Sequence, residues 1–451
     1  MGAQAFPARH GLTDLVHSRV FLIAIAAIVI LCPLSTALAQ SSTPVDVGWR
    51  DFSFGNSGTS DPTGEKPESK LWWNDGLWWG CLYNDSAQAY HIYRLSLATQ
   101  SWTDTGTVLD DRNDTNCDTL WDQTSLKLYV VSHILSQNAG APAPVGQRGQ
   151  LYRYSYNTFT KIYTLDSGFP IEITGGKSET LVVAKDSVGT LWATYTESQK
   201  TMVNHSLNGN DLTWGTPFSL PVTDANNLDA DDVCSIIAYN GKVGVLWSNQ
   251  NTSHMYFGVH IDGDSDQLWQ SAIIYSASAD DHMNVKAAQI SASGGVVAAI
   301  KTSQNAALMI LLTCTSGICA TASDWHSYTL YDSTFGPTRP SLLVDTDNRE
   351  LYFFTRNKNG TQDAIYYKRT SMDNIQFTLN DIGTPFIVSS ATPASIIPPP
   401  PSRTSTPPPA WWPRPAPPAI TFTITRPCSP ATNRRSPRSI PPALPSAARS
   451  R

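Results

Sequence analysis

The recurrence of a two-hairpin unit is the feature that most constrains the fold of this 451-residue chain. The stretch 231–250 shows the first half of the unit: two acidic residues, an apolar run at 233–239, the pair Asn240-Gly241, and a second apolar run at 243–247. An Asn-Gly pair between β-branched and aromatic runs is a strong hairpin signal, because a type I′ turn needs positive φ at both central positions. The stretch therefore predicts two antiparallel strands.

Six such units follow one another along the chain. The first hairpins are expected at 70–83, 118–132, 180–196, 233–247, 285–300 and 341–355, and the second hairpins at 90–103, 150–164, 201–214, 255–270, 307–331 and 364–379. A tryptophan recurs in the fourth strand of four units, at Trp102, Trp214, Trp269 and Trp325. Four strands at a period of about 50 residues are typical of a β-propeller blade, whereas solenoid repeats are shorter.

The predicted fold class is therefore all-β, a six-bladed β-propeller of four-stranded antiparallel blades across residues 45–390. Closing the ring removes exposed sheet edges, which would otherwise invite aggregation. We expect the ring to be closed either by a strand within 45–54 or by the stretch 386–389, and the sequence favours neither.

The N-terminal 39 residues have the order of a secretory signal. Arg9 and Arg19 precede an apolar run at 20–33, and Ala37-Leu38-Ala39 follows it. Cleavage is expected after Ala39. The alternative is an uncleaved membrane anchor, since 20–39 is barely long enough to form a transmembrane helix. Either way we expect the protein to be secreted or held at the cell surface.

The composition changes at residue 391. The last 61 residues contain 18 of the chain's 31 prolines and no glycine, lysine or acidic residue. Such a Pro/Arg-rich stretch favours extended conformations without a packed core, so residues 391–451 are predicted to be a disordered tail or linker. A second hypothesis is that part of this tail is a remnant of a following domain, read in a shifted frame.

The charge distribution limits the partners. Residues 40–390 contain 21 Lys and Arg against 36 Asp and Glu, a net charge of −15. A body this acidic repels nucleic acid and favours cations or neutral polar ligands. We expect an extracellular glycan or small polar ligand as partner, and a membrane only through an uncleaved N-terminal segment.

The predicted fold also selects candidate site residues. In a blade of up-and-down strands, the start of the innermost strand and the end of the second strand lie on the same face, over the centre of the ring. The first-strand starts contribute Glu68, Asp118, Glu179, Asp231, Asp232, Asp281, His282 and Arg339, and the second-strand ends contribute His133, Glu197, Asn249, Gln250, Lys301 and Arg356. We call this set the central face. We expect its ligand-binding residues to be Asp118, His133, Glu179, Asn249, His282, Lys301, Arg339 and Arg356.

Paired carboxylates in a cleft can perform glycoside hydrolysis, one as the acid and one as the base or nucleophile. Glu197 with Asp232 or Asp281 is the candidate catalytic set. The same oxygens could bind Ca²⁺, the one possible cofactor, or could cap strand ends by accepting hydrogen bonds from backbone amides. The chain has no Cys/His cluster with zinc spacing, and no metal is assigned.

Two stretches add a family resemblance. Asp186-Ser-Val-Gly189-Thr190-Leu-Trp192 is similar to the Asp-box of sialidases, Ser-x-Asp-x-Gly-x-Thr-Trp, with one extra residue before the glycine, and 74–78 is a weaker echo. The chain resembles the sialidase-type six-bladed propeller of secreted bacterial proteins over residues 45–390. That family binds the sialate carboxylate with three arginines. In this chain Arg339 and Arg356 stand at matching strand ends, and no third arginine does.

Three functions remain open. The first is a secreted binding module that recognises glycans or another extracellular ligand on the acidic central face. The second, implied by the resemblance, is a sialidase-like exo-glycoside hydrolase. The third is a structural or adhesive cell-surface protein.

The cysteines make the last prediction. Cys314 and Cys319 enclose Thr-Ser-Gly-Ile, a loop short enough for a disulfide to clip across a hairpin. An exported chain reaches a compartment where disulfides persist. We therefore expect a Cys314–Cys319 bond, with two free thiols as the alternative.

Overall fold

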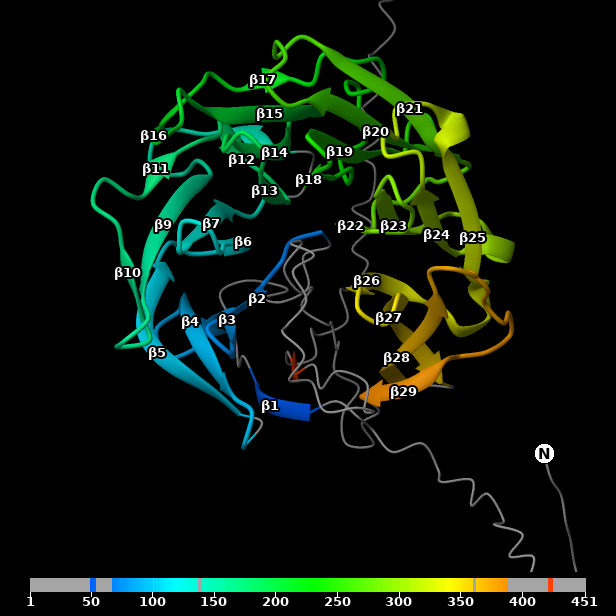
Figure 1. The fold of residues 1–451 in the computed structure, drawn as a ribbon, viewed down its shortest axis with the longest axis horizontal. Helices are drawn as coiled ribbons and strands as arrows, with labels where there is room; N and C mark the ends of the chain where they lie inside the picture. The colour runs from blue at the N-terminus through cyan, green and yellow to red at the C-terminus, as the bar shows by residue number, and fades with distance from the viewer. Residues whose placement is uncertain are drawn as a thin grey trace, which may run out of the picture. The chain divides into compact units, whose positions relative to one another are not determined.

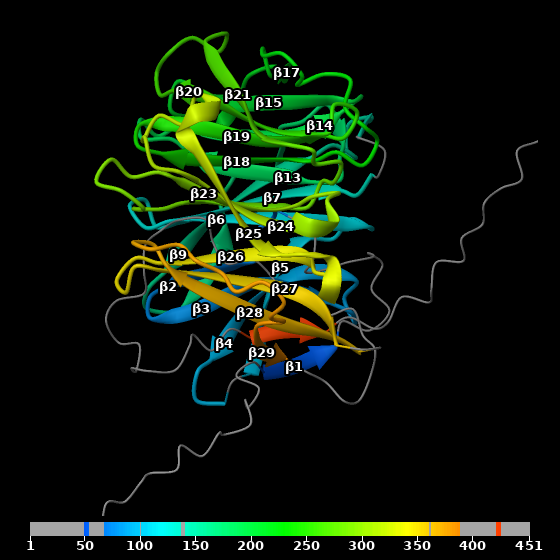
Figure 2. The same cartoon turned by 90° about the vertical axis from the view of Figure 1, so that its right-hand side faces the viewer.

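The computed structural model describes residues 67–99, 101–136, 140–359 and 362–387, together with two short strands, β1 (Trp49–Ser53) and β30 (Thr421–Ile424). Six four-stranded antiparallel sheets are arranged around a common centre (Figure 1). Seen from the side, their strands run between the two faces of the ring (Figure 2). The chain has the predicted six-bladed β-propeller fold.

The strands of each blade follow one another in chain order from the centre of the ring outwards, except that β8 between β7 and β9 lies outside blade 2. Blade 1 contains β2 (Leu71–Asn74), β3 (Leu77–Asn84), β4 (Ala89–Ser96) and β5 (Ser101–Asp110). Blade 2 contains β6 (Thr115–Asp122), β7 (Lys127–Ile134), β9 (Gln150–Asn157) and β10 (Ile162–Leu165), with β11 (Ile171–Glu172) added to β9. Blade 3 contains β13 (Leu181–Lys185), β14 (Leu191–Glu197), β15 (Lys200–Leu207) and β16 (Asn210–Trp214), with β17 (Phe218–Ser219) added to β15.

Blade 4 contains β18 (Cys234–Tyr239), β19 (Lys242–Asn249), β20 (His254–Ile261) and β21 (Trp269–Ser276). Blade 5 contains β22 (Met283–Ala287), β23 (Val296–Lys301), β24 (Met309–Cys314) and β25 (Trp325–Tyr331), and blade 6 contains β26 (Thr338–Asp345), β27 (Glu350–Asn359), β28 (Gln362–Ser371) and β29 (Thr384–Ile387). A two-stranded ribbon pairs β8 (Ala141–Pro142) with β12 (Gly176–Lys177), and 3-10 turns occur at η1 (Asn305–Ala307), η2 (Ala322–Asp324) and η3 (Ser333–Phe335).

Blade 4 shows why the sequence pattern gives this packing. Asn240 and Gly241 have φ of 47° and 68°, as the predicted type I′ turn between β18 and β19 requires. Side chains alternate across a strand, so neighbours on β18 enter different cores. Ile236 packs in the core shared with blade 3, and Ile237 packs in the core shared with blade 5. β18 is therefore buried on both faces, in keeping with its nearly continuous apolar run.

The last blade settles how the ring is completed. β29 forms the outermost strand of blade 6. Of the two predicted alternatives, the stretch 386–389 therefore completes the ring, as far as Ile387, the last residue of that blade that the structure describes. β1 confirms a strand within 45–54, but it pairs in parallel with β30 rather than with a blade.

One predicted strand was wrong. The stretch 376–379, expected as the fourth strand of blade 6, is not a strand. The backbone N–H of Gln376 donates to the Thr370 hydroxyl at 3.0 Å, and the Phe377 ring packs on Phe353. The alternating pattern of this stretch reflects a loop that covers the core. Its backbone forms hydrogen bonds with side chains such as Thr370, and not with a neighbouring strand.

Three of the four repeated tryptophans share one role. The indole N–H groups of Trp214, Trp269 and Trp325 donate to the carbonyl oxygens of Asp211, Asp266 and Cys319, which lie three to six residues earlier. Each indole therefore secures the turn that leads into the outer strand of its blade.

The Asp-box-like stretch stabilises a turn through the side chain of its aspartate. Asp186 Oδ1 accepts the backbone N–H groups of Val188 and Thr190 at 3.1 and 2.7 Å, and Oδ2 accepts the Trp192 indole N–H at 3.0 Å. The aspartate thus ties the turn between β13 and β14 to the following strand. This contact adds to the fold-level resemblance to sialidase-type propellers.

Two disulfides are present among the described residues. Cys314–Cys319 joins the end of β24 to the following loop, with a Cα–Cα distance of 5.7 Å, as predicted. Cys81–Cys117 was not predicted: it links β3 of blade 1 to β6 of blade 2 across 36 residues. Cys234 is a buried free thiol.

The predicted signal or anchor at 1–39 lies outside the described residues, as does the tail from 391 apart from β30. Within the described part of the chain, no helix is long and apolar enough to cross a membrane.

Candidate functional site

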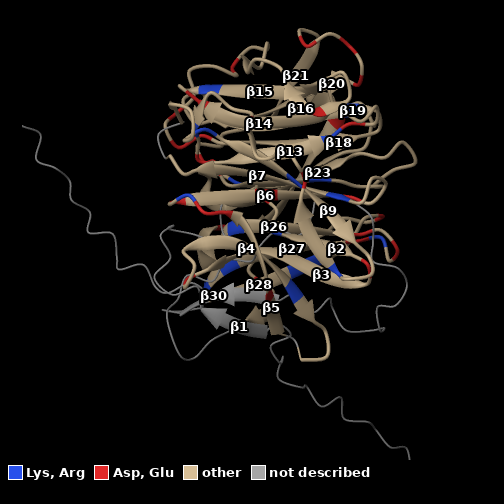
Figure 3. Cartoon of the chain, turned by 90° about the vertical axis from the view of Figure 1, so that its left-hand side faces the viewer, with Lys and Arg blue, Asp and Glu red and all other residues tan. Residues whose placement is uncertain are grey.

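Strand pairing confirms how the central face is built. Asn116 at the start of β6 pairs with His133 near the end of β7, and Thr338 at the start of β26 pairs with Arg356 on β27. The start of each innermost strand therefore lies beside the end of the second strand. Figure 3 shows that acidic positions lie mainly in the turns that join strands.

Three carboxylates converge on this face from three blades. Glu179 precedes β13, Asp231 precedes β18 and Asp281 precedes β22. Each offers an oxygen that lies within 4.8 Å of the other two; Glu179 and Asp281 are buried and Asp231 is exposed. We call these three residues the carboxylate cluster. Hard oxygen ligands at this spacing could hold one Ca²⁺, with the exposed Asp231 on the solvent side.

Blade 5 adds a second charged group beside the cluster. Asp280 accepts from His282 Nδ1 at 2.8 Å and forms an ion pair with Lys301. Burial alone would raise the pKa of Asp280, but His282 and Lys301 bring it below its usual value. Asp281 also lies 3.0 Å from His282 Nδ1, so this imidazole bridges the two aspartates. Asp280 was not predicted from the sequence, although it adjoins two predicted residues.

Glu197 lies at the end of β14, close to Gly175 and Gly176. A Cβ atom on Gly175 would come within 2.8 Å of the Glu197 carboxylate, so the glycine is needed for this approach. Burial raises the pKa of Glu197, and Arg148 only partly offsets this. A raised pKa favours the protonated carboxyl group, which can donate a proton; the sequence pattern left the acid and base roles of Glu197 and its partner undivided.

Three other predicted residues bind the backbone. Asp118 accepts the N–H groups of Ser69 at 2.6 Å and Val183 at 2.9 Å, and so ties β6 to blades 1 and 3. Asp232 accepts from the backbone N–H groups of Asp229 at 2.6 Å and Gln250 at 3.1 Å. Burial raises the pKa of Asp232 despite these bonds.

Asn249 is likewise buried, and its amide donates to the carbonyl oxygen of Asp224 at 3.1 Å. Asp118, Asp232 and Asn249 therefore all bind backbone groups. For the two carboxylates, this is the structural alternative that the sequence left open.

His133 belongs to a fully buried charge network with Glu68 and Lys70. Glu68 lies 2.7 Å from His133 Nε2 and 2.9 Å from Lys70 Nζ, and all three side chains are inaccessible to solvent. His133 Nδ1 lies 2.8 Å from the Ser178 carbonyl oxygen, so both ring nitrogens face acceptors and an imidazolium ring can donate to both. Burial alone would raise the pKa of Glu68, but the two cations bring it below its usual value.

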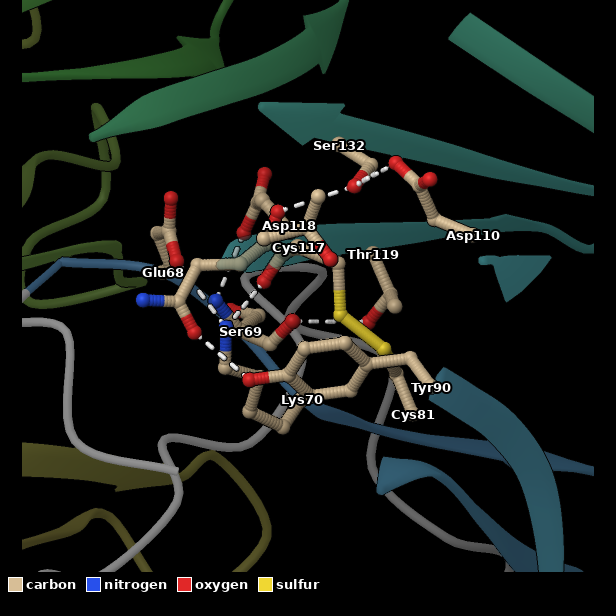
Figure 4. The surroundings of a disulfide bond; sticks show 12 residues. Glu68, Ser69, Lys70, Cys81, Tyr90, Asp110, Cys117, Asp118, Thr119 and Ser132 are labelled. Atoms are coloured by element: carbon tan, nitrogen blue, oxygen red, sulfur yellow. Dashed lines mark hydrogen bonds and ion pairs between the residues drawn. A yellow bond between two sulfur atoms is a disulfide. The ribbon is translucent and has the colours of Figure 1, made fainter. Parts of the chain in front are cut away.

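The Glu68–Lys70–His133 network joins three blades. Lys70 Nζ donates to the Cys117 carbonyl oxygen in blade 2, and Glu68 Oε1 accepts the Leu181 N–H in blade 3 at 3.1 Å. Figure 4 shows Glu68 and Lys70 beside the Cys81–Cys117 disulfide. His133 therefore lies within the wall of the ring, where it secures neighbouring blades.

Arg339 and Arg356 both stand on blade 6 and are partly exposed. Arg339 adopts φ of 56°, at an irregularity of register between Thr338 and Ser341. The two arginines are therefore at the same end of β26 and β27, as predicted. The structure thus brings Glu179, Asp281, His282 and Lys301 together and places both arginines on blade 6. Asp118, His133, Asp232 and Asn249 have hydrogen-bond partners nearby.

The comparisons with known proteins found neither a matching family model nor a matching curated protein. Similar solved structures include the periplasmic gluconolactonase of Pseudomonas aeruginosa, with 12% identity and a TM-score of 0.42, covering 62% of this chain and 78% of that one. The NanB sialidase of Streptococcus pneumoniae has 11% identity and a TM-score of 0.40, covering 70% and 68%. The GH43_1 enzyme of Xanthomonas citri has 12% identity and a TM-score of 0.31, covering 58% and 86%. With TM-scores this low, the fold assignment rests on the six blades themselves.

Proposed function

We propose that this chain is an exported β-propeller binding module whose central face takes a glycan or another polar extracellular ligand. The observation that carries the proposal is the convergence of Glu179, Asp231 and Asp281 from three blades, beside the Asp280–His282–Lys301 group. Like charges this close destabilise the folded state, and a cation or a hydroxyl-rich ligand would relieve that repulsion.

Export is supported by the two disulfides, because such bonds persist mainly in oxidising compartments. Location outside the cytoplasm fits the N-terminal signal expected from the sequence. It also fits extracellular sugars or calcium as ligands.

The test is thermal unfolding of the protein with and without Ca²⁺, combined with a glycan array. A ligand at 100 times its Kd that binds only the folded state should stabilise it by about 2.7 kcal/mol. Asp231→Asn and Asp281→Asn should lose this response. Asp264→Asn is the matched control. Asp264 is an exposed acidic residue in the turn after β20, and this end of β20 lies away from the central face. If neither Ca²⁺ nor any glycan produces a response, the proposal is wrong.

A glycoside hydrolase is the second candidate, favoured by the raised pKa of Glu197. In this alternative Glu197 is the acid, Asp281 supplies base chemistry, and Arg339 and Arg356 bind an anionic group. Turnover of aryl glycosides, sialosides included, would be lost in Glu197→Gln with folding unchanged. Asp232 accepts two backbone N–H groups, so Asp232→Asn should disturb loop packing as well as any turnover. A panel of aryl glycosides without hydrolysis removes this candidate.

A further inference from the structure

A groove of about 660 Å³ lies at the rim of the ring, where blades 3 and 4 meet. On the blade 3 side it is lined by residues 219–223 and Asn226, which belong to β17 and the loop after it. On the blade 4 side it is lined by Trp269 and Ser271 of β21. Figure 1 shows β17 and β21 at the outside of the ring, whereas the central face is formed by the inner strands. We call this feature the rim groove.

The blade 4 wall of the rim groove is held by strand pairing. Trp269 pairs with His260 and Ser271 pairs with Gly258, and residues two apart on a strand share a face. A Cβ atom at Gly258 would lie 3.6 Å from both Leu220 and Trp269, so the two side chains approach the sheet at the same point. The Trp269 ring is further supported by the His260 ring, at a centroid distance of 5.1 Å.

The chemistry of the lining is uncharged. None of the eight described lining residues is ionisable, although the body of the chain is strongly acidic. The Trp269 N–H already donates to Asp266, so the indole offers a ligand its apolar ring surface. Ser219, Thr223 and Ser271, which carry hydroxyl groups, also line the groove. The Ser219 hydroxyl donates to Asn226 Oδ1 at 3.0 Å, which orients that amide.

We propose that the rim groove is a binding site for a neutral saccharide, separate from the central face. A partly exposed tryptophan can stack on the C–H face of a sugar ring, while hydroxyl and amide groups bind its hydroxyls. The absence of a cation among the described lining residues disfavours an anionic sugar, and the volume is that of an ordinary small-molecule site. Because the site is at the rim, it does not depend on the carboxylate cluster.

The test is titration of the full chain with four neutral probes: maltohexaose, cellohexaose, xylohexaose and chitohexaose. Binding is measured by calorimetry and by tryptophan fluorescence. At least one probe should bind, and Trp269→Ala should weaken it tenfold or more. Asn226→Ala changes an exposed residue and should weaken it severalfold without loss of folding, which keeps the test decisive if Trp269→Ala is unstable.

Two controls separate this site from others. Trp214→Ala removes the equivalent tryptophan of blade 3, whose N–H donates to Asp211 in the same way, and should leave binding unchanged. Asp281→Asn should also leave it unchanged, which distinguishes the rim groove from the proposed central site. The proposal is overturned if no probe binds, if Asn226→Ala binds like the wild type, or if Asp281→Asn abolishes binding.

Discussion

Replacing Glu68 by Gln tests whether the buried charge network holds blades 1, 2 and 3 together. The Glu68 carboxylate accepts bonds from His133 Nε2 at 2.7 Å, Lys70 Nζ at 2.9 Å and Leu181 N at 3.1 Å. Gln keeps the shape but presents an N–H₂ group where the carboxylate accepted from Lys70 Nζ or lay against His133 Nε2. Hydrogen bonds to charged groups contribute about 1.5–3 kcal/mol each. Removing one partner of a buried pair typically costs about 3–5 kcal/mol, and we expect a loss in that range.

The assay is equilibrium urea unfolding followed by tryptophan fluorescence at pH 7. A fall in the midpoint with an unchanged m value reports a loss of folded-state stability. Glu350→Gln is the matched control, because Glu350 pairs with Arg369 at 3.3 Å while their side chains are 28% and 61% exposed. Pairs this exposed contribute below about 1 kcal/mol.

The pH dependence gives a second, independent readout. Since the pKa of Glu68 is below its ordinary value of 4.5 in the folded protein, the unfolded chain binds more protons between those two values. The stability due to Glu68 is therefore fully present above pH 4.5 and is lost as the pH falls through the folded-state pKa. The difference between wild type and Glu68→Gln should shrink below pH 4.5. A Glu68→Gln variant no less stable than Glu350→Gln, or a difference that stays constant down to pH 3, would refute the reasoning.

The cysteines give the remaining predictions. In the chain-entropy model, a bond across 36 residues stabilises by about 4 kcal/mol and one across 5 residues by about 2 kcal/mol, so Cys81→Ser/Cys117→Ser should lower the urea midpoint more than Cys314→Ser/Cys319→Ser. Equal midpoints for the two double variants would contradict this. Mass spectrometry of a non-reduced digest should show both linked pairs, and a free-thiol peptide at 314–319 would refute the local one. Burial raises the pKa of Cys234 to about 12, so iodoacetamide at pH 8 should label this thiol only after unfolding; rapid labelling of the folded protein would count against its burial.

Structural features that lie within one hairpin could be predicted well from the sequence, and the one wrong strand has a local cause. The Asn240-Gly241 turn and the Cys314–Cys319 bond each lie within one hairpin, so neighbouring residues decide them. The stretch 376–379 alternates like a strand, yet Thr370 takes the N–H of Gln376 that a ladder would need. An alternation of apolar and polar residues indicates which side chains face the core. A loop that covers the core can have the same alternation as a strand.

Side-chain partners at the site were less predictable. The sequence pattern places Asp118 and Asp281 together among the first-strand starts and gives no reason to separate them, but Asp118 lies within β6 whereas Asp281 precedes β22. Asp118 is bonded to two backbone N–H groups, whereas Asp281 joins the carboxylate cluster. The difference depends on which loops pass near each strand start, and these loops differ from blade to blade.

The sequence by itself determined the six blades, all their strands but the last, and the face on which polar strand ends meet, because hydrophobic period and turn chemistry act over a few residues. Only the tertiary structure decided that Cys81 meets Cys117, and that Glu68 meets His133 across 65 residues. It also decided that Glu179, Asp231 and Asp281 converge, since each stands on a different blade. Such contacts are set by how neighbouring blades pack around the centre, and no short-range pattern along the chain encodes that packing.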